Sequence, residues 1–315
     1  MTEMHKPGIG LALGSGGARG WAHLGALRAL SELGIRFDVV CGTSIGALAG
    51  GFYLTGQLPD LEVWARRLTR LKIVRFMDFG LAKNGLIAGN RLFGEMQRAL
   101  GDIQIEDLSC PFASVATDLF TGHEVWLNKG SLAEAIRASF SLPGLFEPVH
   151  LNGRWIVDGA IVNPIPISVC HAMGAEITVA INLNMPTPGK NGNRRAAKPA
   201  AKPGFEVMPR WPGTILRRKN ETDNDPAPGP NETVVDTPRL LNVLASTMNI
   251  VQDRMTRSRL AAEPPDVVIT PKVGHVGLLD FYKADQAIEA GATAVYQAEA
   301  EIRDALMLFE RTASA

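Results

Sequence analysis

The fold is decided by residues 8–20, GIGLALGSGGARG, and residues 36–46, RFDVVCGTSIG. Each stretch contains a short apolar run, typical of a buried strand, that passes into a glycine-rich turn. Apolar side chains at helical spacing follow each turn, over 18–33 and 45–56. Strand, tight turn and helix, repeated in this order, predict a parallel sheet in an α/β protein.

The alternation of strands and helices continues along the chain. We expect further strands over 111–118, 123–127, 154–158, 176–183 and 266–270, and helices over 60–77, 90–100, 131–139, 239–259 and 283–310. This order predicts a central, mostly parallel sheet flanked by helices. We expect a single domain, 1–315, with its core in 8–184 and 239–310.

Composition changes between the two parts of the predicted core. Residues 186–238 hold ten of the twenty prolines and few branched apolar residues, so 185–238 is predicted to be a flexible insertion. Its basic residues gather before 220 and its acidic residues after it. Composition favours a solvated linker. The alternative is a peripheral membrane contact through 205–219, where apolar side chains lie among basic ones.

Charge and cysteine content indicate which partners and which cellular compartment to expect. The chain carries 32 basic and 32 acidic residues, and this balance argues against a nucleic-acid partner. Its three cysteines are widely spaced and form no disulfide or zinc pattern, as expected in a reducing compartment. The sequence shows no signal peptide and no apolar run long enough to span a membrane. We expect a cytoplasmic protein, peripheral on the inner membrane surface if the insertion binds lipid, with no metal and no cofactor.

The first glycine-rich turn is GSGGARG, residues 14–20. Its glycines leave room for a ligand at the backbone amides, and the following helix adds the positive end of its dipole. A dinucleotide site, an oxyanion hole and a plain tight turn are all compatible with this pattern. A dinucleotide site requires an acidic residue at the end of the second strand. Asp38 lies at the start of that strand instead, which argues against a nucleotide.

The second turn, Gly42-Thr43-Ser44-Ile45-Gly46, has the G-x-S-x-G form of a nucleophile elbow. It follows an apolar strand and precedes a helix, which is the context that this motif requires. Ser44 then needs a base. His275, which lies in a loop, is one candidate, and Asp158, directly after the strand 154–158, is the other. An ordinary Asp-Gly turn at Asp158-Gly159 is the structural alternative.

Taken together, these residues resemble the patatin-like phospholipase family. The loop 14–20, the elbow 42–46 and the tripeptide 158–160 occur in the family's order, over about residues 8–184 and more loosely over 239–300. Residues 135–148 resemble the block before the family's aspartate, and 163–166 the block after it. The form GSGGARG is similar to the bacterial and neuropathy-target-esterase-type branch. Ser15 departs from the glycine that many members carry there.

The resemblance implies a three-layer fold and a serine–aspartate dyad without histidine. Ser44 would be the nucleophile and Asp158 its base, while the amides of Gly16 and Gly17 would receive the oxyanion. Arg19 would orient the loop or meet a lipid phosphate. The supporting glycines would be Gly14, Gly20, Gly42, Gly46 and Gly159.

The implied function is a serine lipid acyl hydrolase that cleaves fatty-acyl esters of phospholipids or lysophospholipids through an acyl-enzyme. We expect burial to raise the pKa of Asp158 above its ordinary value of about 3.9. The alternatives are an acyltransferase, a general carboxylesterase, or a membrane-recruited regulatory protein with weak activity. The sequence does not define the head group, the acyl chain or the oligomeric state.

Overall fold

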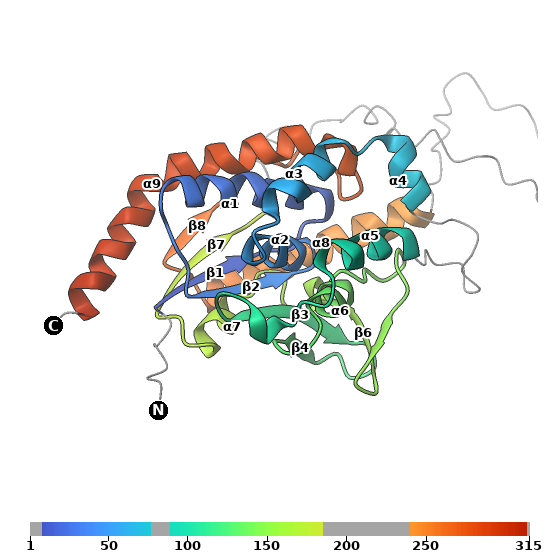
Figure 1. The fold of residues 1–315 in the computed structure, drawn as a ribbon, viewed down its shortest axis with the longest axis horizontal. Coiled ribbons are helices and arrows are strands. Elements are labelled where there is room, and N and C mark those ends of the chain that lie inside the picture. Colours follow the sequence, from blue (N-terminus) through green and yellow to red (C-terminus); the bar gives the residue numbers. More distant parts are fainter. Residues whose placement is uncertain (1–7, 77–88, 185–239, 314–315) are drawn as a thin grey trace, which may run out of the picture. The chain divides into compact units, whose positions relative to one another are not determined.

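A computed structural model of the protein describes residues 8–76, 89–184 and 240–313 (Figure 1). Within them, eight strands form one sheet in the order β5-β6-β3-β2-β1-β7-β8, with β4 also paired to β3. The strands are β1 (Ile9–Leu13), β2 (Val39–Thr43), β3 (Phe112–Asp118), β4 (Glu124–Leu127), β5 (Val149–Leu151), β6 (Arg154–Asp158), β7 (Ile177–Ile181) and β8 (Val267–Ile269). Strands β1, β2, β3, β7 and β8 are parallel, while β4, β5 and β6 pair antiparallel. The predicted central, mostly parallel sheet is confirmed.

Helices flank this sheet, as the alternation of elements predicted. They are α1 (Ala22–Glu32), α2 (Ile45–Leu54), α3 (Leu58–Arg66), α4 (Arg70–Phe76), α5 (Asn90–Leu100), α6 (Leu132–Ser139), α7 (Ile167–Ala172), α8 (Leu240–Ala262) and α9 (Ala284–Ala313). Helix α2 packs on β1, β2 and β3, and α9 packs on β7 and β8 and along α1 (Figure 1). Helix α7 packs on β1, β2 and β7.

Alternate residues of the strands enter two separate apolar cores. Leu11, Leu13 and Val40 belong to the larger core, which also contains side chains of α1, α2, α6 and α9. Ala12 and Val39 belong to a smaller core with residues of α7. Because successive side chains of a strand point to opposite faces, the two cores lie on opposite sides of the sheet. The result is a layer of sheet between helices, which buries the parallel strands on both faces.

The structure corrects the sequence prediction at one helix and adds two short elements. The helix predicted over 60–77 is two helices, α3 and α4, separated at 67–69. The Thr69 hydroxyl accepts a hydrogen bond from the backbone N–H of Lys72 at 3.3 Å, which caps a new helix at that point. Strand β5, of three residues, and helix α7, of six residues, were not predicted from the sequence.

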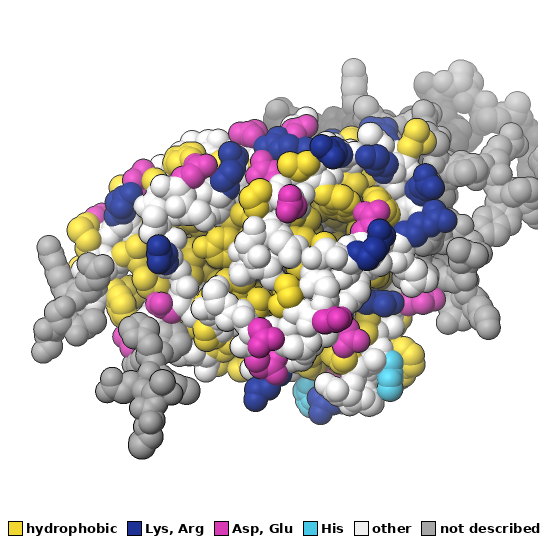
Figure 2. All heavy atoms as spheres, viewed as in Figure 1, with side chains coloured by type: hydrophobic (Ala, Val, Ile, Leu, Met, Phe, Trp, Pro, Cys, Tyr) yellow, Lys and Arg dark blue, Asp and Glu magenta, His cyan; other side chains and the backbone are white. Residues whose placement is uncertain are grey.

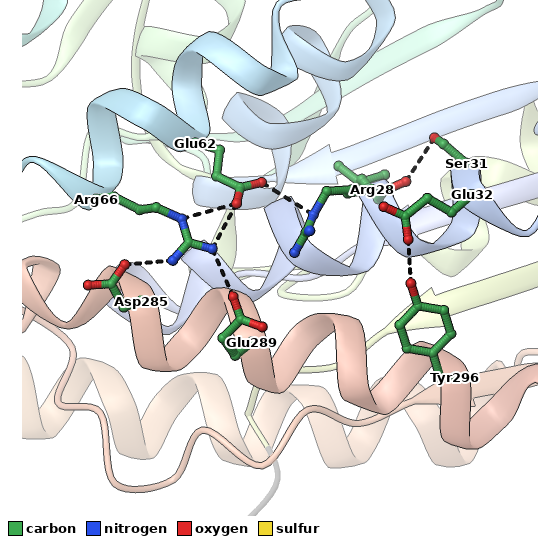
Figure 3. A network of polar contacts seen from close by, with 9 residues as sticks. Arg28, Ser31, Glu32, Glu62, Arg66, Asp285, Glu289 and Tyr296 are labelled. Atoms are coloured by element: carbon green, nitrogen blue, oxygen red, sulfur yellow. Dashed lines mark hydrogen bonds and ion pairs between the residues drawn. The ribbon is translucent and has the colours of Figure 1, made fainter.

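Charged side chains hold α3 against α9 (Figure 3). Arg66 on α3 contacts Glu62 on its own helix at 2.8 Å, and Asp285 and Glu289 on α9 at 2.6 and 2.9 Å. A single exposed ion pair contributes little to the free energy of folding, but Arg66 contacts three carboxylates on two helices. The network therefore helps to fix the position of α3.

Two further sequence predictions concern membranes and domains. None of the described helices is both long enough and apolar enough to cross a bilayer. The predicted insertion at 185–238, with its membrane contact at 205–219, lies outside the described residues, so both stay predictions.

Candidate active site

Ser44 occupies a one-residue turn between β2 and α2. Its backbone has φ 57° and ψ −121°, a conformation that L-residues rarely adopt and that costs roughly 1–3 kcal/mol. The turn also brings α2 very close to the end of β1. A side chain at Gly46 would place its Cβ 2.1 Å from the carbonyl oxygen of Leu13. This turn therefore requires glycine at position 46, and it holds the strained Ser44 at the sheet edge.

Strand β3 brings Ser44 and Asp158 together. Thr43, at the end of β2, pairs with Val115, and the next residue of β3, Ala116, pairs with Asp158 on β6. Two residues 114 positions apart thus lie on either side of one strand. The Ser44 hydroxyl donates a hydrogen bond to Oδ2 of Asp158 at 2.5 Å.

Asp158 is buried and held in one orientation. Its Oδ1 accepts a hydrogen bond from the amide of Ala160 at 2.8 Å, its amide donates to the carbonyl of Ser141, and its carbonyl accepts from the Thr117 hydroxyl. The side chain is 1% exposed. Burial raises the pKa of Asp158 to about 7, against the smaller effects of the two hydrogen bonds to its carboxylate. At neutral pH this carboxylate is therefore a stronger base than an ordinary aspartate.

A second serine, Ser139, holds the backbone of the turn at Ser44. Its hydroxyl accepts a hydrogen bond from the backbone N–H of Ser44 at 2.7 Å and donates to the carbonyl of Val115 at 2.5 Å. From its sequence context Ser139 is predicted to be structural, at the end of a helix, and it does end α6. Its contact with the nucleophile turn was not predicted, because no local pattern joins residues 95 positions apart.

The glycine-rich loop presents free amides beside Ser44. Within the described residues, the amides of Gly14, Ser15, Ala18 and Arg19 donate to carbonyl groups, but no hydrogen bond is made by the amides of Gly16 or Gly17. Gly17 has φ 54° and lines the same small cavity as Ser44 and Asp158. Two unpartnered N–H groups at a helix start are suited to hold an oxyanion.

Buried polar side chains hold this loop in place. Arg19, 8% exposed, donates through Nε to the Gly16 carbonyl at 3.2 Å and through Nη2 to Asn249 on α8 at 2.6 Å. Burial lowers the pKa of Arg19 to about 10, so it remains cationic at neutral pH. Arg19 lines neither of the two cavities described below, and its observed contacts orient the loop. Ser15 accepts a hydrogen bond from Asn184 at 3.2 Å.

Among the described residues, no histidine makes a hydrogen bond with Ser44 Oγ, whose partner is Asp158. His275, considered from the sequence as a base, is exposed on a turn and makes no described contact with Ser44. His23 is fully buried, and its Nε2 lies 2.7 Å from the carbonyl oxygen of Gly14. Since a carbonyl only accepts, Nε2 carries the proton. Burial lowers the pKa of His23 to about 4, so it stays neutral and braces the loop.

The remaining glycines of the sequence prediction all stand where a side chain has little room. An added Cβ would lie within 3 Å of another atom at Gly14, Gly20, Gly42, Gly46 and Gly159. The block after Asp158 explains part of this crowding. The carbonyls of Asn163 and Pro164 accept hydrogen bonds from the Thr43 hydroxyl and the Ser15 amide, which ties the two turns together.

Two cavities meet at the site. A small one, about 20 Å³, is lined by Ser44, Asp158 and Gly17 together with apolar side chains and Gln252 of α8. A large one, about 690 Å³, lies among α2, α3, α4 and α5 and is mostly apolar. Figure 2 shows hydrophobic side chains between α3, α4 and α5, with basic side chains around them. Four residues line both cavities and form the wall between them: Phe140, Leu145, Phe146 and Phe281.

One known protein family matches the part of the chain that contains these turns. The family model described as "Patatin-like phospholipase" matches residues 11–171, which include both glycine-rich turns and Asp158. The chain belongs to the patatin-like phospholipase family. Membership confirms the prediction of an enzyme that hydrolyses lipid esters.

Individual relatives indicate to which branch of the family the chain belongs. An uncharacterized NTE family protein of Mycobacterium bovis is 30% identical over 93% of this chain and 91% of its own length. Neuropathy target esterase sws of Drosophila melanogaster is 35% identical over 56% of this chain and 13% of its own length. The predicted neuropathy-target-esterase-type branch is thereby confirmed. Among solved structures, VipD from Legionella pneumophila aligns with a TM-score of 0.40 at 16% identity, covering 55% of this chain and 49% of VipD.

Proposed function

We propose that the protein hydrolyses fatty-acyl esters of phospholipids or lysophospholipids through an acyl-enzyme on Ser44. Asp158 takes the hydroxyl proton as Ser44 attacks the ester carbonyl, and the amides of Gly16 and Gly17 hold the oxyanion. The leaving alcohol receives the proton, and water then releases the fatty acid. The observation that carries the proposal is the hydrogen bond of 2.5 Å from the strained Ser44 to a buried carboxylate.

The large cavity supports a long acyl chain as the substrate. Its volume of about 690 Å³ is within the roughly 300–1,000 Å³ range of ligand pockets, and its lining is aromatic and aliphatic. It shares four side chains with the cavity at Ser44, so a chain in it would have its ester near the nucleophile. The charged residues of its lining are Asp60, Glu95 and Arg98, and Lys72 and Arg75 are exposed on the adjoining helix α4.

The pH dependence tests the identity of the base. We expect kcat/KM to fall about tenfold per unit as pH decreases below about 7, because protonated Asp158 cannot accept the Ser44 proton. The measurement is a pH–rate profile with a soluble ester. Two histidine variants serve as controls: His23→Gln, which keeps a donor for the Gly14 carbonyl but does not titrate, and His275→Ala. Both are expected to show the same fall in kcat/KM below about pH 7. A profile without a limb between pH 5 and 8, or one removed by His275→Ala, would contradict the role of Asp158.

Chain-length selectivity tests the large cavity and the substrate class together. With 1-acyl lysophospholipids below their aggregation threshold, kcat/KM is expected to rise with chain length, by up to about 0.8 kcal/mol for each buried methylene. Met96→Trp on α5 would narrow the cavity and cut the rate on long chains by about tenfold, while rates on short chains stay within about twofold. Gln97→Trp, on the exposed side of the same helix, is the matched control.

The wild-type result also discriminates between functions. Released fatty acid identifies a hydrolase, whereas transfer of the acyl group to an added alcohol acceptor in preference to water identifies an acyltransferase. A flat dependence on chain length, equal for wild type and Met96→Trp, would favour a general carboxylesterase. No release of fatty acid from any chain length would refute the proposed function.

A further inference from the structure

Helix α8 carries a row of polar residues on the face that contacts the loops of the site. Asn249, Gln252, Thr256 and Arg259 are spaced by three, four and three residues, so they share one face of the helix. Asn249 accepts from Arg19 at 2.6 Å, Thr256 from Asn184 at 3.3 Å, and Arg259 donates to the Val162 carbonyl at 3.1 Å. Three of the four residues thus have partners in the loops around Ser44.

Gln252 differs from these neighbours. It is 3% exposed, and its Oε1 has no hydrogen-bond partner among the described residues. A buried amide oxygen without a partner lowers stability, so each such group requires an explanation. Several other buried polar atoms share this lack of a partner, but of their residues Gln252 is the one that lines the cavity at Ser44 and Asp158.

The size and lining of the small cavity indicate its ligand. A volume of about 20 Å³ accommodates one water molecule, provided that polar groups surround it. The polar side chains of the lining are Ser44, Asp158 and Gln252, and the rest of the lining is Gly17 with seven apolar residues. The cavity therefore combines the volume of a water with the Gln252 side chain on α8 and a base on β6.

We propose that Gln252 binds the water that hydrolyses the acyl-enzyme. This inference rests on the proposed function. Once Ser44 is acylated, its Oγ no longer donates to Asp158, and a water in the cavity donates one hydrogen to Asp158 and the other to Oε1 of Gln252. The water oxygen attacks the acyl carbonyl carbon and its proton passes to Asp158. The bond from the carbonyl carbon to Ser44 Oγ then breaks, Oγ takes the proton from Asp158, and the fatty acid leaves.

This role predicts that Gln252 acts on deacylation and not on acylation. Gln252→Leu and Gln252→Met remove the amide and keep a side chain of similar size. With p-nitrophenyl octanoate we expect each variant to show a burst of about one p-nitrophenolate per enzyme, followed by a steady-state rate about tenfold below that of wild type. Labelling of Ser44 by a fluorophosphonate, which needs no water, is expected at the wild-type rate, and this also reports that the variants are folded.

Thr256→Val is the matched control, because it removes an equally buried hydrogen-bonding group one turn along α8 that does not line the cavity. It is expected to show neither a burst nor a slower steady state. The inference is overturned if the Gln252 variants turn over like wild type, if labelling and turnover fall together, or if Thr256→Val gives the same burst. Wild type that is folded but not labelled at Ser44 would overturn the proposed function, and this inference with it.

Discussion

Asp158→Asn and Ser44→Ala should each reduce ester hydrolysis on the order of 10⁴-fold or more, the loss expected when a nucleophile or its base is removed. Asparagine has the shape of aspartate, but its amide nitrogen is a donor and its oxygen is a weak base. It therefore leaves Ser44 Oγ, now 2.5 Å from the Asp158 carboxylate, without an acceptor for its proton. The measurements are steady-state hydrolysis of a lysophospholipid and fluorophosphonate labelling, and labelling is expected to disappear in Ser44→Ala.

Matched controls are available on the neighbouring strand and helix. Asp118 is also a buried aspartate at the end of a strand, but it accepts hydrogen bonds from the amides of Phe120 and Thr121 in its own turn. Ser141 donates to the Arg137 carbonyl. Asp118→Asn and Ser141→Ala should keep activity within a few-fold of wild type. Activity lost equally in Asp118→Asn and Asp158→Asn would indicate a structural role for both carboxylates and contradict the dyad.

Stability provides a second readout for Asp158. Its pKa is higher in the folded protein, about 7 against 3.8, so this carboxyl lowers stability progressively as pH rises from about 4 to about 7, and the full cost remains above pH 7. At roughly 1.36 kcal/mol per unit, this is a cost of at most about 4 kcal/mol at pH 8, part of which Asp158→Asn removes. We therefore expect the variant to unfold thermally at a temperature equal to or above that of wild type at pH 8. This combination is typical of a residue kept for catalysis at the expense of stability.

The sequence predicted the site residues that lie in short local motifs, which are Ser44 and Asp158. The elbow around Ser44 needs glycine at Gly46 because the Leu13 carbonyl lies against it, and that requirement is visible in five residues. Asp158 follows its strand directly and is followed by glycine. The order of strands then decides that both residues lie beside β3, and the βαβα pattern of the first 56 residues already implied a parallel sheet there.

The unpredicted parts depend on contacts between distant elements. Gln252 lies on α8, 94 residues beyond Asp158, and no motif in the sequence of this helix distinguishes it. Ser139 lies in the block 135–148 that resembles the family. Its hydrogen bond with the Ser44 amide, however, depends on where α6 ends relative to β3. The large cavity depends on the separation of α3 from α4, a break that one hydroxyl, Thr69, helps to create within a continuous helical pattern. Periodicity does not report such side-chain contacts.

Gly17→Ala should reduce kcat by about 10²–10³-fold, the loss typical of a missing oxyanion donor. Gly17 has φ 54°, and an added Cβ would lie 2.4 Å from the Leu278 carbonyl oxygen, which accepts the Ala18 amide. The loop must therefore move, and its free amides turn away from the carbonyl that Ser44 attacks.

Gly34→Ala separates this effect from the general cost of a left-handed residue. Gly34 has φ 74°, but a Cβ there would meet no atom within 4 Å. Both variants pay about 1 kcal/mol or more for the backbone conformation, so Gly34→Ala should lower the unfolding temperature and leave kcat unchanged. Gly17→Ala should lower both the unfolding temperature and kcat, and each by more than Gly34→Ala does. Circular dichroism melts paired with single-turnover acylation measure the two quantities separately. If Gly17→Ala loses only as much kcat as Gly34→Ala, its amide does not hold the oxyanion.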